Sequence, residues 1–140
     1  MNMTETREPR VCDIILAQLG GGGLRGAVCY CGGRNLVGSD RSRAGECHGS
    51  RFAAGGLIEE STEGFLRFKV NGKRNETWLM HISLELSDTY TVYLQAINKK
   101  MEILWTEKRE DVYCDEVKDV VETMYDEAIR KYNGGFINLD

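Results

Sequence analysis

TWLMHISLELSDTYTVYLQAI, residues 77–97, sets the architecture of this chain. Apolar side chains recur at every second position on both sides of the turn sequence SD at 87–88. Alternation with a period of two predicts strands that each bury one face, and the short turn between them makes the pair antiparallel. His81 alternates with the large apolar side chains of the first strand, so we predict a surface or edge histidine there.

The flanking segments extend this pair into a larger antiparallel sheet. GFLRFKV (64–70) alternates and is followed by NGK (71–73), which is a hairpin turn signal. MEILWTEK (101–108) adds a strand on the other side. Upstream, GAVCYC (26–31) is predicted as a short strand, and RNLVGSD (34–40) as a further strand or a turn. From these segments we predict an antiparallel sheet of four to five strands.

Helical spacing appears at both ends of the sheet. After Pro9, apolar residues recur every three or four positions as far as Leu19, and Gly20 is a suitable helix end. A second stripe, with Asp111 as its predicted cap, consists of Tyr113, Val117, Val120, Val121, Met124, Ala128 and Ile129. The fold class is therefore α+β: a short N-terminal helix, an antiparallel sheet and a long C-terminal helix packed on the sheet.

The composition is that of a soluble globular protein, with 41% hydrophobic and 29% charged residues. No apolar run approaches the about 18 residues that a membrane span needs, and the N-terminal residues are polar, so we expect a cytoplasmic location. The 140 residues are predicted to form a single domain. Within it, residues 1–8 are expected to be a flexible arm, and the glycine-rich residues 40–62 a long loop or insertion.

The stretch LGGGGLRG (19–26) matches the G-x-G-x-x-G spacing of dinucleotide-binding loops through Gly21, Gly23 and Gly26. That loop follows a strand and opens a helix, so that the phosphates meet the positive end of the helix dipole. Here the glycines follow a predicted helix and precede a predicted strand. We therefore expect a connecting loop, and no cofactor.

Cys29, Cys31, Cys47 and His48 carry the sulfur and imidazole donors that zinc prefers. Their C-x-C and C-H spacing differs from the paired C-x₂-C of common zinc modules, so separate free thiols are the main expectation and a zinc site is the alternative. A cysteine nucleophile needs a base, and nothing in the sequence orders His48 or His81 beside a cysteine. We therefore predict a protein that is not an enzyme.

Acidic residues are concentrated toward the C-terminal helix, with ten acidic and three basic residues between Glu102 and Glu127. A solvated helix face is one interpretation, and a surface that docks a basic protein partner is the other. The residues predicted to contact a protein partner are Asp115, Glu116, Asp119 and Glu122, together with Arg41, Arg43, Arg51 and Phe52 of the long loop. These arginines, with Phe52, also allow an alternative in which the loop contacts nucleic acid.

Five motifs occur in an order that resembles a widespread family of small uncharacterised proteins from bacteriophages and other mobile elements. They are ILAQLGG (15–21), GGRN (32–35), LRFKV (66–70), ISLELSDTYTVYL (82–94) and EDVYCDEVKDVVETM (110–124). The resemblance implies an α+β fold and a mobile-element origin, but no activity. The C-x-C pair and residues 40–62 depart from the family pattern.

These observations predict a protein-binding domain of phage or mobile-element origin. An inhibitor of a host defence system, comparable to an anti-CRISPR protein, is one role of this kind. The alternative is a nucleic-acid-binding accessory protein that acts through the arginine-rich 40–62 loop.

Overall fold

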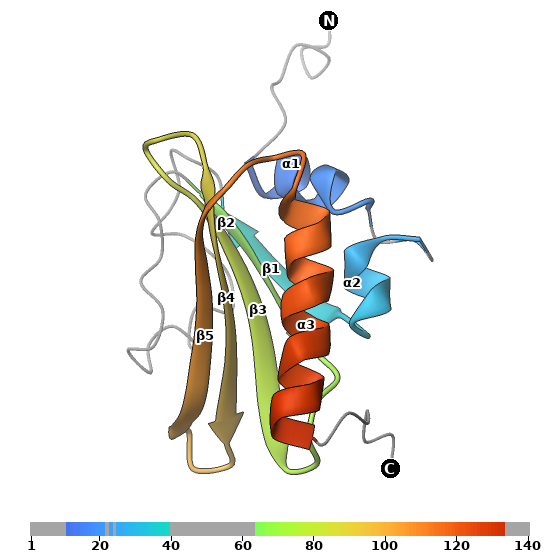
Figure 1. The fold of residues 1–140 in the computed structure, drawn as a ribbon, viewed down its shortest axis with the longest axis vertical. Helices are drawn as coiled ribbons and strands as arrows, with labels where there is room; N and C mark the ends of the chain where they lie inside the picture. Colours follow the sequence, from blue (N-terminus) through green and yellow to red (C-terminus); the bar gives the residue numbers. More distant parts are fainter. Residues whose placement is uncertain (1–10, 22, 24, 40–63, 134–140) are drawn as a thin grey trace, which may run out of the picture.

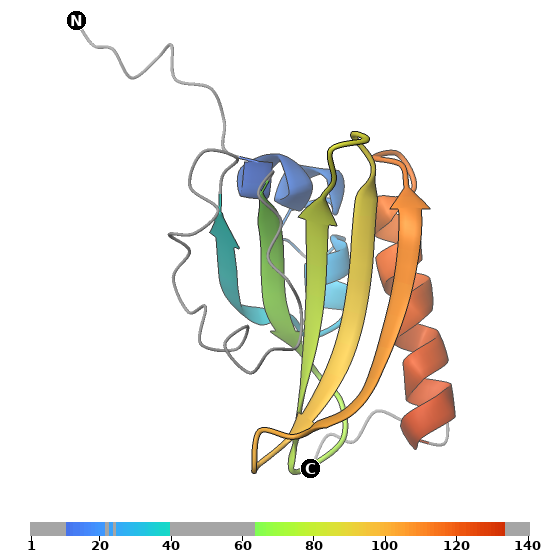
Figure 2. The same cartoon turned by 90° about the vertical axis from the view of Figure 1, so that its left-hand side faces the viewer.

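The computed structural model of this chain describes residues 11–21, 23, 25–39 and 64–133. Its centre is one antiparallel sheet of five strands, whose spatial order equals their order along the chain. The strands are β1 (Arg34–Ser39), β2 (Phe65–Val70), β3 (Glu76–Leu84), β4 (Tyr90–Asn98) and β5 (Ile103–Val112). Helices α1 (Val11–Gln18), α2 (Ala27–Tyr30) and α3 (Val117–Asn133) lie on one face of this sheet (Figure 1 and Figure 2). The predicted α+β class is confirmed, with a long C-terminal helix packed on the sheet.

The hydrophobic core lies between the sheet and these helices. Trp78, Met80 and Ile82 of β3 point into it, and the register places them opposite Ala96, Leu94 and Val92 of β4. The helices contribute Ile15, Leu19, Val117, Val121, Met124, Tyr125 and Ala128. Burying one large apolar side chain of this kind stabilises a fold by about 1.5–3 kcal/mol, so the helix-facing side of the sheet provides most of the driving force for folding.

Side chains on the opposite face of the central strands are also buried, which corrects the prediction for His81. The His81 side chain is 0% exposed, so it is not a surface histidine. Its ring is stacked on Phe65, with 4.8 Å between ring centroids, and contacts the edge of Tyr93 at 5.8 Å. The alternating pattern assigned His81 to the correct face, but a pattern within one strand does not reveal whether that face is accessible to water.

The predicted strand at 26–31 is wrong, because these residues contain the short helix α2. The Cys31 amide donates a hydrogen bond to the Ala27 carbonyl at 3.1 Å, as in a helical turn. As a consequence Cys29 is exposed and Cys31 is buried, whereas a strand would have placed both on one face. Six residues are too few to distinguish a strand from one helical turn by periodicity, and contact with α3 selects the helix.

The glycine-rich stretch connects α1 to α2. Gly20 and Gly21 have φ values of 93° and 76°, a conformation that favours glycine, and they end α1 as predicted. The Ala27 amide returns to donate a hydrogen bond to the Leu19 carbonyl at 2.8 Å. Gly26 packs so closely on this turn that an added Cβ would lie 2.3 Å from the Gly21 carbonyl oxygen. The described glycines therefore serve a tight reversal of the chain.

The junction between β5 and α3 differs from the prediction. β5 continues to Val112 and α3 begins at Val117, so Asp111 belongs to a strand and is not a helix cap. Tyr113 precedes the helix and is 58% exposed, so it is not part of the buried stripe. Asp111 has a φ of 58°, and the β4–β5 register shifts beside it, which together mark a bulge that re-aims the chain toward α3.

Several expectations concern residues outside the described ranges. They are the arm at 1–8, Pro9 and the loop at 40–62. Among the described helices, none combines the length and apolar character needed to cross a membrane.

Candidate functional site

The acidic residues predicted to contact a partner lie at the start of α3. Asp115 and Glu116 directly precede the helix, and Asp119 and Glu122 lie in its first two turns. Asp119 and Glu122 are three residues apart, which places them on one side of the helix, and Asp115 lies in the turn that leads into it. Asp126, four residues further on, extends this row. We call these four residues the acidic row.

The C-terminal half of the acidic row is engaged by neighbouring side chains. Lys118 forms an ion pair with Glu122 at 3.1 Å. The Tyr30 hydroxyl of α2 donates to both carboxylate oxygens of Asp126, at 2.9 and 2.8 Å. The hydrogen bond to Asp126 raises the pKa of Tyr30 to about 12, because it stabilises the protonated phenol. This half of the row therefore faces α2 and supports the packing of α2 on α3.

The N-terminal half of the acidic row is the more accessible part. Asp115 and Asp119 are exposed, and neither forms an ion pair with a described residue. Glu116 is also exposed, but its Oε1 accepts a hydrogen bond from the Tyr113 amide at 3.1 Å and so stabilises the turn before α3. The structure thus brings the four predicted acidic residues together, with Asp115 and Asp119 best placed to meet a partner.

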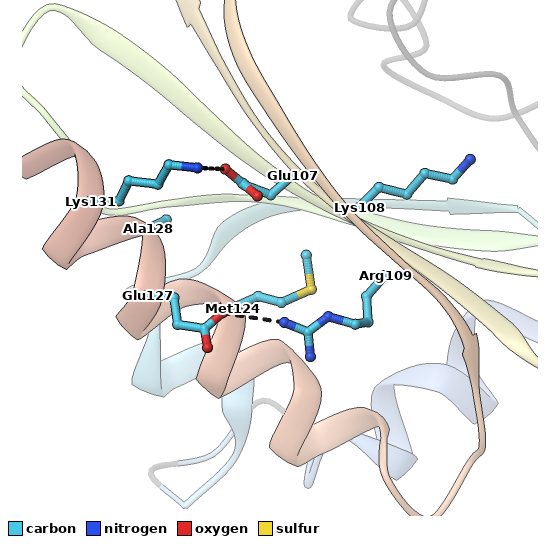
Figure 3. Close-up of a pocket in the computed structure, with 7 residues that line it drawn as sticks. All are labelled: Glu107, Lys108, Arg109, Met124, Glu127, Ala128 and Lys131. Atoms are coloured by element: carbon cyan, nitrogen blue, oxygen red, sulfur yellow. Dashed lines mark hydrogen bonds and ion pairs between the residues drawn. The ribbon is translucent and has the colours of Figure 1, made fainter.

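A second candidate surface lies on the opposite flank of α3, where a small groove separates this helix from β5 (Figure 3). Two ion pairs cross the groove: Lys131 to Glu107 at 3.0 Å, and Arg109 to Glu127 at 3.2 Å. Between them lie the apolar side chains of Met124 and Ala128. The groove is lined by Glu107, Lys108, Arg109, Met124, Glu127, Ala128 and Lys131.

An aromatic stack adjoins this groove and holds β5 against α3. Trp105 of β5 lies parallel to Tyr132 of α3, with ring centroids 3.9 Å apart, and Trp78 meets Trp105 edge-on at 4.8 Å. The Tyr132 hydroxyl donates to Glu107 at 2.5 Å. That hydrogen bond, with the nearby Lys131 ammonium, lowers the pKa of Glu107, so this carboxylate stays ionised. No local pattern predicts this cluster, because each of its contacts joins residues more than 20 positions apart in the sequence.

Cys29 and Cys31 are the two residues of the predicted zinc set that the structure describes, and their environments differ. Cys29 is exposed on α2, while burial of the Cys31 thiol raises its pKa and keeps it protonated. Cys47 and His48 lie outside the described residues, as do Arg41, Arg43, Arg51 and Phe52. Within the described ranges, no three histidine, cysteine or acidic side chains gather as a metal site would require.

Comparison with protein-family models, curated proteins and solved structures found no match for this chain. The resemblance to phage and mobile-element proteins therefore stays a prediction.

Proposed function

We propose that this chain is a non-enzymatic protein-binding domain that docks a basic surface of a partner protein on the N-terminal end of α3. The observation that carries the proposal is the exposure of Asp115, in the turn before α3, and of Asp119, in the first turn of α3. The motif order described above supports a phage or mobile-element origin. Within that class, an inhibitor of a host defence system, comparable to an anti-CRISPR protein, is the role that we propose.

The charge balance of this surface supports association with a cation-rich partner. Residues 115–126 contain five carboxylates and a single lysine, Lys118. Lys118 is already paired with Glu122, so it does not offset the charge of Asp115 and Asp119. An uncompensated negative patch accelerates encounter with a positive surface and disfavours binding of nucleic acid. The effect falls with ionic strength, since the screening length is about 10 Å at about 0.1 M salt.

Affinity capture from a bacterial lysate tests the proposal, with the tagged chain as bait. The variant Asp115→Asn/Asp119→Asn removes both charges and nearly preserves side-chain size. The matched control is Glu102→Gln, which removes an exposed carboxylate at the β4–β5 turn, at the opposite end of the sheet (Figure 1). We expect the wild type and the control to retain the same basic protein, and the double variant to lose it without a change in melting temperature.

Two outcomes contradict the proposal. Equal capture by the double variant would exclude the acidic row as the docking surface. Recovery of nucleic acid without a protein, sensitive to salt, would favour the accessory role predicted for residues 40–62.

A further inference from the structure

The outer edge of β5 has no strand partner among the described residues. β5 pairs with β4 on one side only and is the last strand of the sheet (Figure 2). In an antiparallel ladder, alternate residues of an edge strand direct their N–H and C=O groups away from the sheet. Such an edge is a template for another strand unless it is blocked.

Two bulges limit the part of this edge that can accept a strand. The β4–β5 register shifts between Ala96 and Ile97, opposite Leu104, and again between Tyr90 and Val92, next to Asp111. Between these bulges β5 is regular from Trp105 to Arg109. A bulge interrupts the hydrogen-bond ladder, so only this short regular stretch can pair with another strand. The number of possible registers for such a pair is therefore small.

The charges of this stretch alternate in sign on the helix-facing side. Glu107 and Arg109 are held on that side by their ion pairs with Lys131 and Glu127 of α3. Lys108 lies on the other side, where it forms an ion pair with Glu110 at 2.8 Å. On the helix-facing side, the negative Glu107 and the positive Arg109 therefore lie two residues apart, with Lys108 between them in the sequence.

We infer that β5 pairs with β5 of a second copy of this chain, antiparallel and with Lys108 on the two-fold axis. A two-fold axis perpendicular to the sheet keeps the helix-facing side of both copies on the same side of the joined sheet. Two residues that lie opposite one another across the axis must therefore point to the same face. With Lys108 at the centre, Glu107 of each copy lies opposite Arg109 of the other. This register gives two complementary pairs against one like pair, Lys108 with Lys108. Within the regular stretch, centring on Glu107 or on Arg109 gives a like pair and no complementary pair, and centring on Thr106 gives no charge pair at all.

Several neighbouring features fit this arrangement. The two Lys108 side chains lie opposite one another on the other face, and the ion pair of each with Glu110 at 2.8 Å offsets part of their repulsion. The flank of α3 that carries Glu127 and Lys131 lies beside β5, so the same flank of the second copy comes to face it (Figure 3). These two residues have opposite charges, and the apolar side chains of Met124 and Ala128 line the groove with them. Pairing thus shields these apolar side chains and adds complementary charges.

Charge reversal with rescue tests the pairing, read out as molar mass by light scattering after size exclusion. We expect the wild type to be a dimer, and Glu107→Arg and Arg109→Glu each to be monomeric, because each places like charges opposite one another. Mixing the two single variants places arginine opposite glutamate twice and should restore a dimer containing one copy of each. Lys73→Glu, an exposed charge reversal in the turn between β2 and β3, is the control and should leave the dimer intact.

A register-specific cross-link provides the second measurement. In a chain whose Cys29, Cys47 and Cys114 are replaced by serine, Lys108→Cys places two thiols at the axis, within disulfide distance. Thr106→Cys is the control. In the proposed register its two thiols are offset by four residues, or about 13 Å along the strands at about 3.4 Å per residue. We expect cross-linked dimer only with Lys108→Cys. A monomeric wild type, two folded single variants that do not associate on mixing, or equal cross-linking at both positions would overturn the inference.

Discussion

The substitution His81→Phe should remove a large part of the pH dependence of folding. The His81 ring lies on the side of β3 that faces away from the helices, flanked in the register by Arg67 of β2 and Tyr93 of β4. It is fully buried, and neither ring nitrogen has a hydrogen-bond partner within the described structure. Burial, together with the positive charge of Arg67, lowers the pKa of His81 to about 3.

The size of the effect follows from the difference between folded and unfolded states. In the unfolded chain the pKa of His81 is about 6.5, so below this pH the unfolded state binds a proton that the folded state does not. The contribution of neutral His81 to the free energy of unfolding is fully present above about pH 6.5. This contribution decreases progressively as the pH falls to about 3. At about pH 5 the loss is about 2 kcal/mol, and the limit below about pH 3 is about 5 kcal/mol.

Urea unfolding of the wild type and His81→Phe at about pH 7.5 and about pH 5 measures this loss. The difference in stability at the higher pH is the reference, because a phenyl ring has no unsatisfied nitrogen but is larger than the imidazole that it replaces beside Phe65. At the lower pH the wild type should lose about 2 kcal/mol more than the variant, since the carboxyl groups titrate alike in both proteins. An equal loss in both proteins, or an NMR titration of His81 near its unfolded pKa, would show that the ring is accessible to water.

Two further predictions concern the connection between α1 and α2. Gly26→Ala should lower the free energy of unfolding by about 1–3 kcal/mol, because the new Cβ would meet the Gly21 carbonyl oxygen at 2.3 Å. Gly23→Ala, where no described atom lies within 4 Å, should change it by less than about 0.5 kcal/mol, and equal effects in chemical denaturation would contradict this packing. In a thiol-reactivity assay of the folded chain, Cys29→Ser should remove one rapidly reacting thiol, whereas Cys31→Ser should remove none. Rapid reaction of Cys31 would mean that α2 does not pack as described.

Local patterns were sufficient to predict most of the sheet and the long helix. The alternation in 64–70, 77–86 and 89–97 corresponds to β2, β3 and β4, because a meander needs only neighbouring strands and short turns. The helical spacing from Val117 onward corresponds to α3. The acidic row could be predicted for the same reason, since residues three and four apart on one helix lie on one side.

Features that depend on distant segments were beyond such patterns. Ala27–Tyr30 forms a helix because it packs on α3, which begins 90 residues after Ala27. The ion pairs of Glu107 and Arg109 require β5 and α3 to lie side by side, and nothing near either residue in the sequence predicts that contact.

By itself, the sequence determined the order and type of the main elements and the helix that carries the acidic residues, because hydrophobic period and charge spacing act over a few residues. Only the tertiary structure decided that His81 is buried, that Cys29 and Cys31 differ in exposure, and that β5 is the last strand of the sheet formed by the described residues. Burial and pairing are properties of surfaces that meet in space, and the residues that form them are separated along the chain.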